Sequence, residues 1–177
     1  MAIKAIQTNK HVMNNCSNAK ALERYSQRHD NVLSLLAGWI LSTKSTEQEL
    51  FVDLPSEKWN PIDQVFQPAC RPDILVIEHS KIFVLELTIC HETNLVNSKN
   101  YKINKYNAIQ NLLQPAYRNF NVKIFTHEIS SLGFIGDLND FRKATKLPHL
   151  VKSVKSSLIR SVLNDSYNIY RLRNSSI

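Results

Sequence analysis

Two carboxylates lie where two predicted strands of this chain meet. Asp73 follows Pro72 at the entrance of one apolar run, and Glu86 lies within the next run, two residues before Thr88. Because side chains alternate along a strand, Glu86 and Thr88 share one face of the sheet. Mg²⁺ favours one or two carboxylates and keeps water ligands, and such an ion can activate water and stabilise charge on a phosphate. Asp73 and Glu86 are therefore predicted to bind catalytic Mg²⁺, which Mn²⁺ can replace at an oxygen-rich site.

The two acids differ in what their surroundings imply. Asp73 after a proline is also the common pattern of a turn residue. Glu86 lies inside the apolar run 83–87, where burying a carboxylate is costly unless a metal or a cation accompanies it. A functional role is favoured for both, and more strongly for Glu86.

A lysine falls on the apolar side of the helix predicted after these strands. Lys102 recurs at helical spacing with Leu95, Tyr106, Ile109 and Leu113, which directs its side chain toward the sheet. An inward-facing ammonium group needs a partner. The carboxylate pair or a bound phosphate could be that partner.

These residues require a mixed arrangement of strands and helices. Prolines and polar clusters separate periodic segments, and no internal repeat is present. The expected elements are a helix over 18–42, a short strand over 49–52, a hairpin of strands over 74–77 and 82–87, a helix over 92–113, a strand over 122–126, a helix near Phe141 and a basic helix opened by Pro148. The predicted class is α/β, a mixed β-sheet flanked by helices.

Length and composition exclude several classes of protein. A chain of 177 residues with 43% hydrophobic residues suits one globular domain. The longest apolar run near the start, residues 32–41, is too short for a membrane span. No secretory signal is recognisable, and three cysteines at unrelated spacings do not suggest disulfides. We expect an intracellular protein without membrane contact, nuclear if the source is eukaryotic.

The positive charge is concentrated at the C-terminal end. Residues 142–177 contain eight Lys or Arg and one Asp, which accounts for the net charge of +7. Such a surface favours nucleic acid as a partner, although a solvated, lysine-rich helix has the same composition. The residues predicted to contact DNA are Arg71, Lys99, Arg142, Lys143, Lys152, Lys155 and Arg160.

The central segment resembles a known nuclease family. RPDILVI (71–77), VLELT (84–88) and ICHETNLVNSKNYKINKY (89–106) are similar to the restriction-like endonuclease domain of site-specific non-LTR retrotransposons, in the PD-(D/E)XK superfamily. Thr88 stands where the superfamily has a lysine. The retrotransposon domain has a K-x-x-KY helix instead, matched here by Lys102, Lys105 and Tyr106. The resemblance implies that the catalytic lysine has moved to this helix; both lysines are candidates, and Lys102 is preferred.

The resemblance extends over residues 11–136. HVMNNC (11–16) and RYSQRHDNVLSLL (24–36) are similar to the end of a CCHC zinc knuckle and the first nuclease helix, and HEISSLGFIG (127–136) is similar to a strand and turn of the family. Only the last two knuckle ligands are present, so no zinc is expected. The implied domains are a knuckle remnant at 1–17, a restriction-endonuclease-like core at 18–147 and a basic helical segment at 148–177.

The resemblance implies a metal-dependent DNA endonuclease that hydrolyses phosphodiester bonds. Asp73 and Glu86 would bind Mg²⁺, Lys102 or Lys105 would complete the catalytic set, and Asp30, Glu92 and Thr88 are possible accessory residues. A homodimer is possible. Two other functions stay open: a catalytically degenerate or domesticated module that binds nucleic acid without cleaving it, and a junction-resolving nuclease of the same fold.

Overall fold

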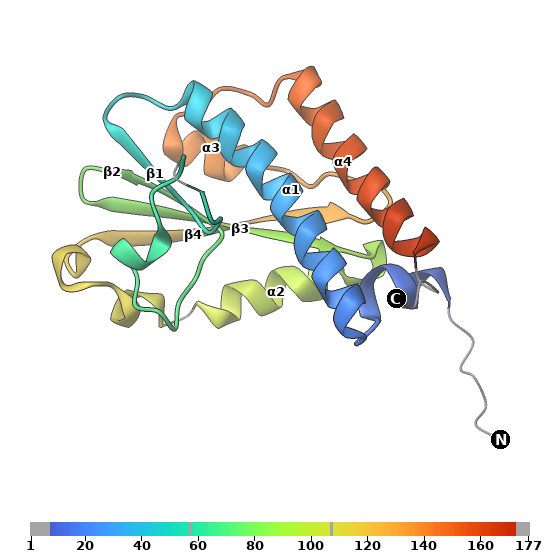
Figure 1. The fold of residues 1–177 in the computed structure, drawn as a ribbon. Coiled ribbons are helices and arrows are strands. Elements are labelled where there is room, and N and C mark those ends of the chain that lie inside the picture. The colour runs from blue at the N-terminus through green and yellow to red at the C-terminus, as the bar shows by residue number, and fades with distance from the viewer. Residues whose placement is uncertain (1–7, 57, 107, 173–177) are drawn as a thin grey trace.

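The sheet at the centre of the molecule is mixed, as the sequence predicts. The computed structural model describes residues 8–56, 58–106 and 108–172, and these form one four-stranded sheet in the order β1 (Gln48–Val52), β2 (Ile74–Glu78), β3 (Lys81–Cys90) and β4 (Asn121–Ser130). The first three strands are antiparallel neighbours, and β4 runs parallel to β3 (Figure 1). The predicted strands and the hairpin are confirmed.

A two-residue turn sets the register of the central hairpin. Glu78 pairs with Lys81, and His79 between them adopts a left-handed conformation with φ 55°. This turn aligns Ile74 with Leu85 at the other end of the hairpin. Residues at the start of β2 therefore lie beside the middle of β3, because β3 is twice as long as β2.

Three helices cover one face of the sheet (Figure 1). They are α1 (Ala19–Thr43), α3 (Asn139–Thr145) and α4 (Lys152–Arg171). The side chain of Asn18 caps α1 by accepting a hydrogen bond from the Lys20 backbone N–H. Leu158 and Val162 of α4 are fully buried in the same core as α1. The basic C-terminal segment therefore packs on the sheet layer, and its helix begins four residues after Pro148 rather than at it.

The opposite face carries shorter elements. They are the helix α2 (Leu95–Lys105) and the short helical turns Ile62–Gln64, Glu92–Asn94, Ile109–Leu112 and Pro115–Tyr117. A further turn, His11–Asn15, contacts α1 and α4 instead. The predicted single helix over 92–113 is wrong in length, because Tyr106 and Ile109 enter the core from a tight turn after α2 ends. α2 is rich in asparagine, a weak helix former.

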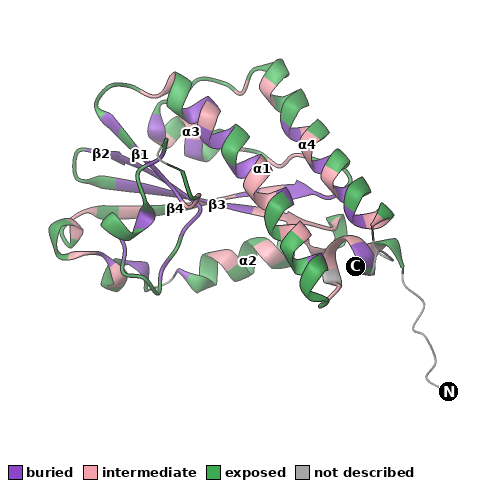
Figure 2. Ribbon diagram, in the orientation of Figure 1, coloured by how far each residue is buried: buried purple, intermediate pink, exposed green. Residues whose placement is uncertain are grey.

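Two apolar cores sandwich the sheet. Figure 2 shows buried residues along the strands and the inward side of α1, whereas α2 has none. One core joins α1, α3 and α4 to the sheet, and the second packs Tyr106 and the turns against the other face. None of the helices in the described part of the chain combines the length and apolar character that crossing a bilayer requires.

Candidate active site

The hairpin register brings the two predicted acids together. Asp73 lies one residue before β2, beside Glu86 of β3, and both side chains are buried, with residue exposures of 7% and 0%. The Asp73 backbone N–H donates to Glu86 Oε1 at 3.2 Å. The Leu87 N–H donates to Asp73 Oδ2 at 2.7 Å. This carboxylate therefore extends the hydrogen bonding between the two strands past Ile74, the first residue of β2.

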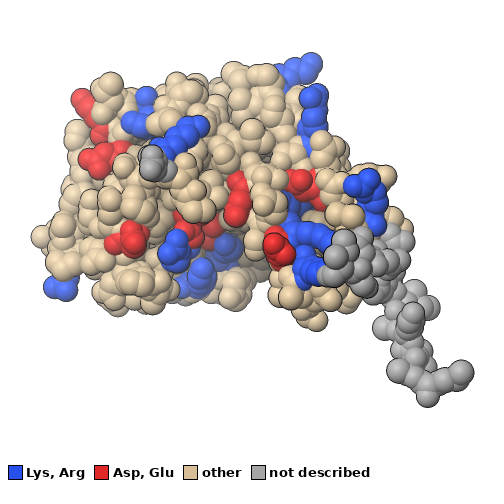
Figure 3. Space-filling model, in the orientation of Figure 1, with Lys and Arg blue, Asp and Glu red and all other residues tan. Residues whose placement is uncertain are grey.

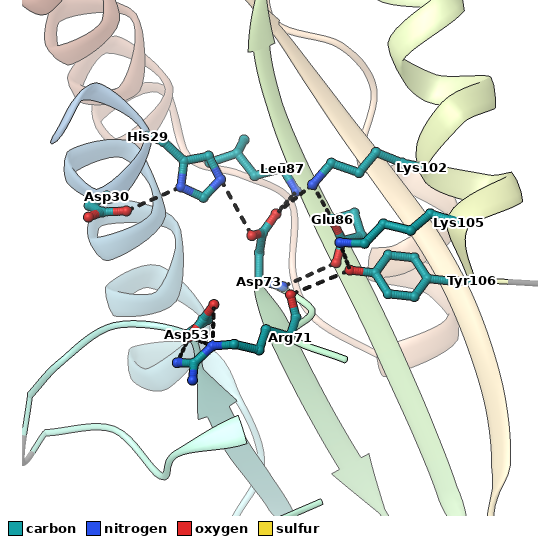
Figure 4. A network of polar contacts seen from close by, with 10 residues as sticks. All are labelled: His29, Asp30, Asp53, Arg71, Asp73, Glu86, Leu87, Lys102, Lys105 and Tyr106. Atoms are coloured by element: carbon teal, nitrogen blue, oxygen red, sulfur yellow. Dashed lines mark hydrogen bonds and ion pairs between the residues drawn. The ribbon is translucent and has the colours of Figure 1, made fainter. Parts of the chain in front are cut away.

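Lys102 reaches both carboxylates from α2. Its Nζ lies 2.5 Å from Glu86 Oε2 and 3.6 Å from Asp73 Oδ2, and its side chain is only 21% exposed (Figure 4). The helical spacing correctly predicts that this lysine faces the sheet. Two carboxylates that converge on one ammonium group can also converge on a metal ion, and oxygen donors of this kind fit Mg²⁺ or Mn²⁺.

His29 completes the cluster from the other side of the sheet. Its Nε2 lies 3.5 Å from Asp73 Oδ1, and its Nδ1 lies 3.3 Å from Asp30 Oδ1 (Figure 4). The sequence periodicity favours a core histidine at position 29. This prediction does not include the contact with Asp73. The signal that could have found it is its place within the RHD segment, 28–30.

The surroundings move the pKa values of the two acids in opposite directions. Burial by itself would raise the pKa of Asp73, but His29, Lys102 and the Leu87 N–H hold it below its ordinary value. Burial and the neighbouring charge of Asp73 raise the pKa of Glu86 despite Lys102. One acid is thus kept ionised while the other holds its proton more readily, which is common at functional sites.

Lys102 keeps its charge in this environment. Burial would lower its pKa, but the negative charges of Asp73 and Glu86 raise it above the ordinary value. The same balance applies to His29: burial would lower its pKa, but the hydrogen bond and negative charge of Asp73 and the hydrogen bond to Asp30 together raise it. The cluster therefore favours the charged forms of Lys102 and His29.

Lys105 occupies a different position. Its Nζ donates to Tyr106 Oη at 2.9 Å and lies 4.7 Å from the centre of the Tyr106 ring. The Tyr106 hydroxyl donates to the backbone carbonyl of Arg71 at 3.4 Å, and burial followed by the charge of Glu86 raises its pKa far above the ordinary value. Of the two lysines that the sequence leaves open, the described contacts bring only Lys102 to the carboxylates.

The three possible accessory residues lie around this cluster at different places. Thr88 is on the same face of β3 as Glu86, and its hydroxyl oxygen is buried without a hydrogen-bond partner among the described residues. Among the described contacts, Asp30 is linked to the cluster through His29. Glu92 instead accepts a hydrogen bond from Ser130 Oγ at 3.1 Å, which fixes the start of α2 against β4.

The residues predicted to bind DNA are divided between several surfaces. Arg71 pairs with Asp53, and Lys99 is exposed on α2. The remaining five belong to α3 or α4, on the opposite side of the sheet from α2, and are Arg142, Lys143, Lys152, Lys155 and Arg160. In the view of Figure 3, Lys and Arg lie at separate places with Asp and Glu between them.

A second group of potential metal ligands lies at the other end of the hairpin. Ligand atoms of Glu47, Glu78 and His79 lie within 4.8 Å of one another, and Glu47 and His79 are exposed. Lys146 Nζ, however, already contacts Glu78 Oε1 at 2.9 Å. This group provides a comparison for the Asp73 cluster, which differs from it by being buried.

Comparison with known proteins adds no assignment. The chain matches no protein-family model, and a search of curated proteins finds no significant match. The functional interpretation therefore depends on the residues and their geometry.

Proposed function

We propose that the protein is a metal-dependent DNA endonuclease that hydrolyses phosphodiester bonds. The observation that carries this proposal is the convergence of Asp73, Glu86 and Lys102 at one point. Two buried acids and a lysine of this kind are the residues implied by the resemblance to the retrotransposon nuclease domain. The mixed sheet with flanking helices is compatible with a restriction-endonuclease-like fold, which forms part of the proposal.

Each residue of the cluster has a distinct role in this proposal. Asp73 and Glu86 would hold Mg²⁺, which when bound supplies an activated water and neutralises charge on the phosphate. Lys102 keeps a positive charge beside the carboxylates, and its ammonium group donates hydrogen bonds to the nucleophile or to a phosphate oxygen. His29 orients Asp73 through its contact with Oδ1.

Plasmid cleavage tests the proposal. Supercoiled DNA is incubated with purified protein in Mg²⁺, Mn²⁺ or chelator, and the wild type is compared with Asp73→Asn, Glu86→Gln and Lys102→Ala. Cleavage is expected only with metal, and each variant is expected to lose at least about a hundredfold in rate, as removal of one catalytic electrostatic group commonly does. Glu47→Gln, which changes an exposed carboxylate of the other acidic group, is the matched control.

A non-cleaving, nucleic-acid-binding module is the second candidate. Lys102 already forms an ion pair within the cluster, and Thr88 stands at the strand position where the superfamily has a lysine. This candidate predicts a gel shift that persists in Asp73→Asn and plasmid that stays supercoiled with either metal. That combination of results would contradict the nuclease proposal.

A further inference from the structure

A groove opens beside the candidate active site, between α2 and the second half of β3. Its volume is 410 Å³, within the range of ligand-binding pockets. It is lined by Thr88, Asn94, Asn97, Ser98, Tyr101 and Lys102. Because Lys102 also contacts Glu86 and Asp73, the groove is continuous with the acidic cluster.

The lining of the groove is polar but almost uncharged. Lys102 is its one charged residue, and its ammonium group is engaged by the carboxylates. The side chains of Asn94, Asn97 and Tyr101 have no hydrogen-bond partner among the residues that the structure describes. Their donors and acceptors are therefore available to a ligand.

Asn94 and Tyr101 leave polar and aromatic surface uncovered in the groove. Asn94 joins the turn Glu92–Asn94 to α2 in a helical backbone conformation, and its side chain makes no capping bond. Tyr101 is 68% exposed on the helix surface. Some other amides are held by backbone carbonyls, as Gln48 is by Thr145 and Gln110 by Phe120.

This chemistry matches a nucleobase better than a phosphate. A phosphate site needs positive charge or clustered N–H donors, and the groove has no free cation among its lining residues. A side-chain amide offers one acceptor and two donors, which can pair with the edge of a base. An exposed aromatic ring provides a stacking surface for any base.

We propose that this groove binds the base of the nucleotide next to the reacting phosphate, stacked on Tyr101 and hydrogen-bonded by Asn94 or Asn97. This inference rests on the proposed nuclease function and specifies its substrate: DNA with an unpaired base beside the cleavage point. A base within an intact duplex is stacked and paired, whereas an unpaired base reaches a protein pocket at the lowest energetic cost.

The test is a double-mutant cycle between the protein and the DNA. The affinity of a labelled single-stranded oligonucleotide is measured by fluorescence anisotropy in chelator, with each nucleotide replaced in turn by an abasic one. Tyr101→Ala is expected to weaken binding about tenfold, as loss of one stacked base does, whereas Tyr101→Phe keeps the ring and the affinity. Tyr167→Ala removes a similarly exposed tyrosine from α4, at 63% exposure, and is the matched control.

The cycle identifies the contact through non-additivity. Wild type is expected to lose affinity at one abasic position, and Tyr101→Ala to show no further loss there. Equal losses in both proteins, equal weakening by Tyr167→Ala, or no binding by the wild type would each overturn the groove assignment.

The two proposals fail separately. If cleavage requires metal and binding does not depend on Tyr101, the groove assignment is rejected and the nuclease proposal stands. If binding depends on Tyr101 and no metal supports cleavage, the groove assignment stands and the nuclease proposal is rejected. Asn97→Ala, compared with wild type on oligonucleotides that differ in the base at the coupled position, then tests recognition of the base edge; an unchanged order of preference would overturn that part.

Discussion

The helices α1 and α2 approach Asp73 from opposite faces of the sheet, and they are built in different ways. α1 has 25 residues, eight of them buried, and contributes His29. α2 has 11 residues and no buried one, and contributes Lys102. α1 is thus held by apolar packing, whereas ion pairs and hydrogen bonds make a large part of the attachment of α2. The position of α1 is therefore set mainly by the apolar core, whereas that of α2 depends on the polar residues it places beside the carboxylates.

Truncation of one apolar residue in each helix should show the largest contrast. Leu36 of α1 is fully buried, so Leu36→Ala is expected to cost about 2–5 kcal/mol of unfolding free energy. Val96 of α2 is 71% exposed, and Val96→Ala should change the same quantity by less than about 0.5 kcal/mol. Urea denaturation of both variants gives the comparison, and similar losses would contradict it.

A buried histidine on the α1 side of the sheet should dominate the loss of unfolding free energy at low pH. His127 of β4 is fully buried, and both ring nitrogens lack a partner among the described residues. Burial lowers its pKa to about 4, with Asp137 and Lys155 nearby. The unfolded chain binds a proton more readily, so the stability from neutral His127 is complete above about pH 6.5 and is lost as the pH falls toward 4, by about 3 kcal/mol at most.

A comparison with His127→Leu isolates this contribution. The raised pKa of Glu86 acts in the opposite sense over part of the same window, but it does so in both proteins. The difference between their unfolding free energies should therefore change between pH 6.5 and 4. Parallel stability curves would show that His127 is not the source of the acid response.

Removal of the Lys102 ammonium group should affect the carboxylate cluster more than the rest of the fold. Lys102→Met leaves Glu86 and Asp73 without their shared cation, and we expect a loss of about 1–3 kcal/mol, as for other buried groups left unpaired. If the carboxylates bind Mg²⁺, added metal should raise the melting temperature of this variant more than that of the wild type. Lys105→Met, which removes the contact with Tyr106 and leaves the Lys102 ion pairs in place, serves as the control.

Replacement of the basic residues of α4 should have the smallest effect on stability. Its effect on DNA binding is measured separately. Replacement of the exposed Lys152, Lys155 and Arg160 with alanine should change the unfolding free energy little. If they contact DNA, the dependence of log affinity on log salt should flatten by about 0.7–0.9 for each lost phosphate contact. An unchanged salt dependence would exclude α4 and leave the α2 side as the DNA surface.

Local patterns in the sequence predict the strands and α1. The apolar runs 74–77 and 82–87, separated by four polar residues, favour a hairpin, and the helical spacing of Lys102 directs its side chain toward the sheet. The set of Asp73, Glu86 and Lys102 is predicted from this spacing together with the resemblance to the retrotransposon nuclease domain.

The parts that sequence reasoning misses depend on distant contacts. The predicted helix over 92–113 ends early because Tyr106 and Ile109 pack into a second core that is formed with residues 51–84. His29 contacts Asp73 across 44 positions of chain, and no local pattern reports that distance. The basic residues of 142–160 look like one surface in sequence, but the packing of α4 on α1 places them on the side of the sheet away from α2.

The hydrogen bond from the Leu87 N–H to Asp73 Oδ2 also gives this acid a structural role, because it satisfies a backbone donor of β3 where the pairing with β2 has ended. An inactive descendant of the protein would still need an acceptor there, so selection for folding alone would retain Asp73. The presence of Asp73 in a diverging copy of this gene would therefore not by itself indicate a working site.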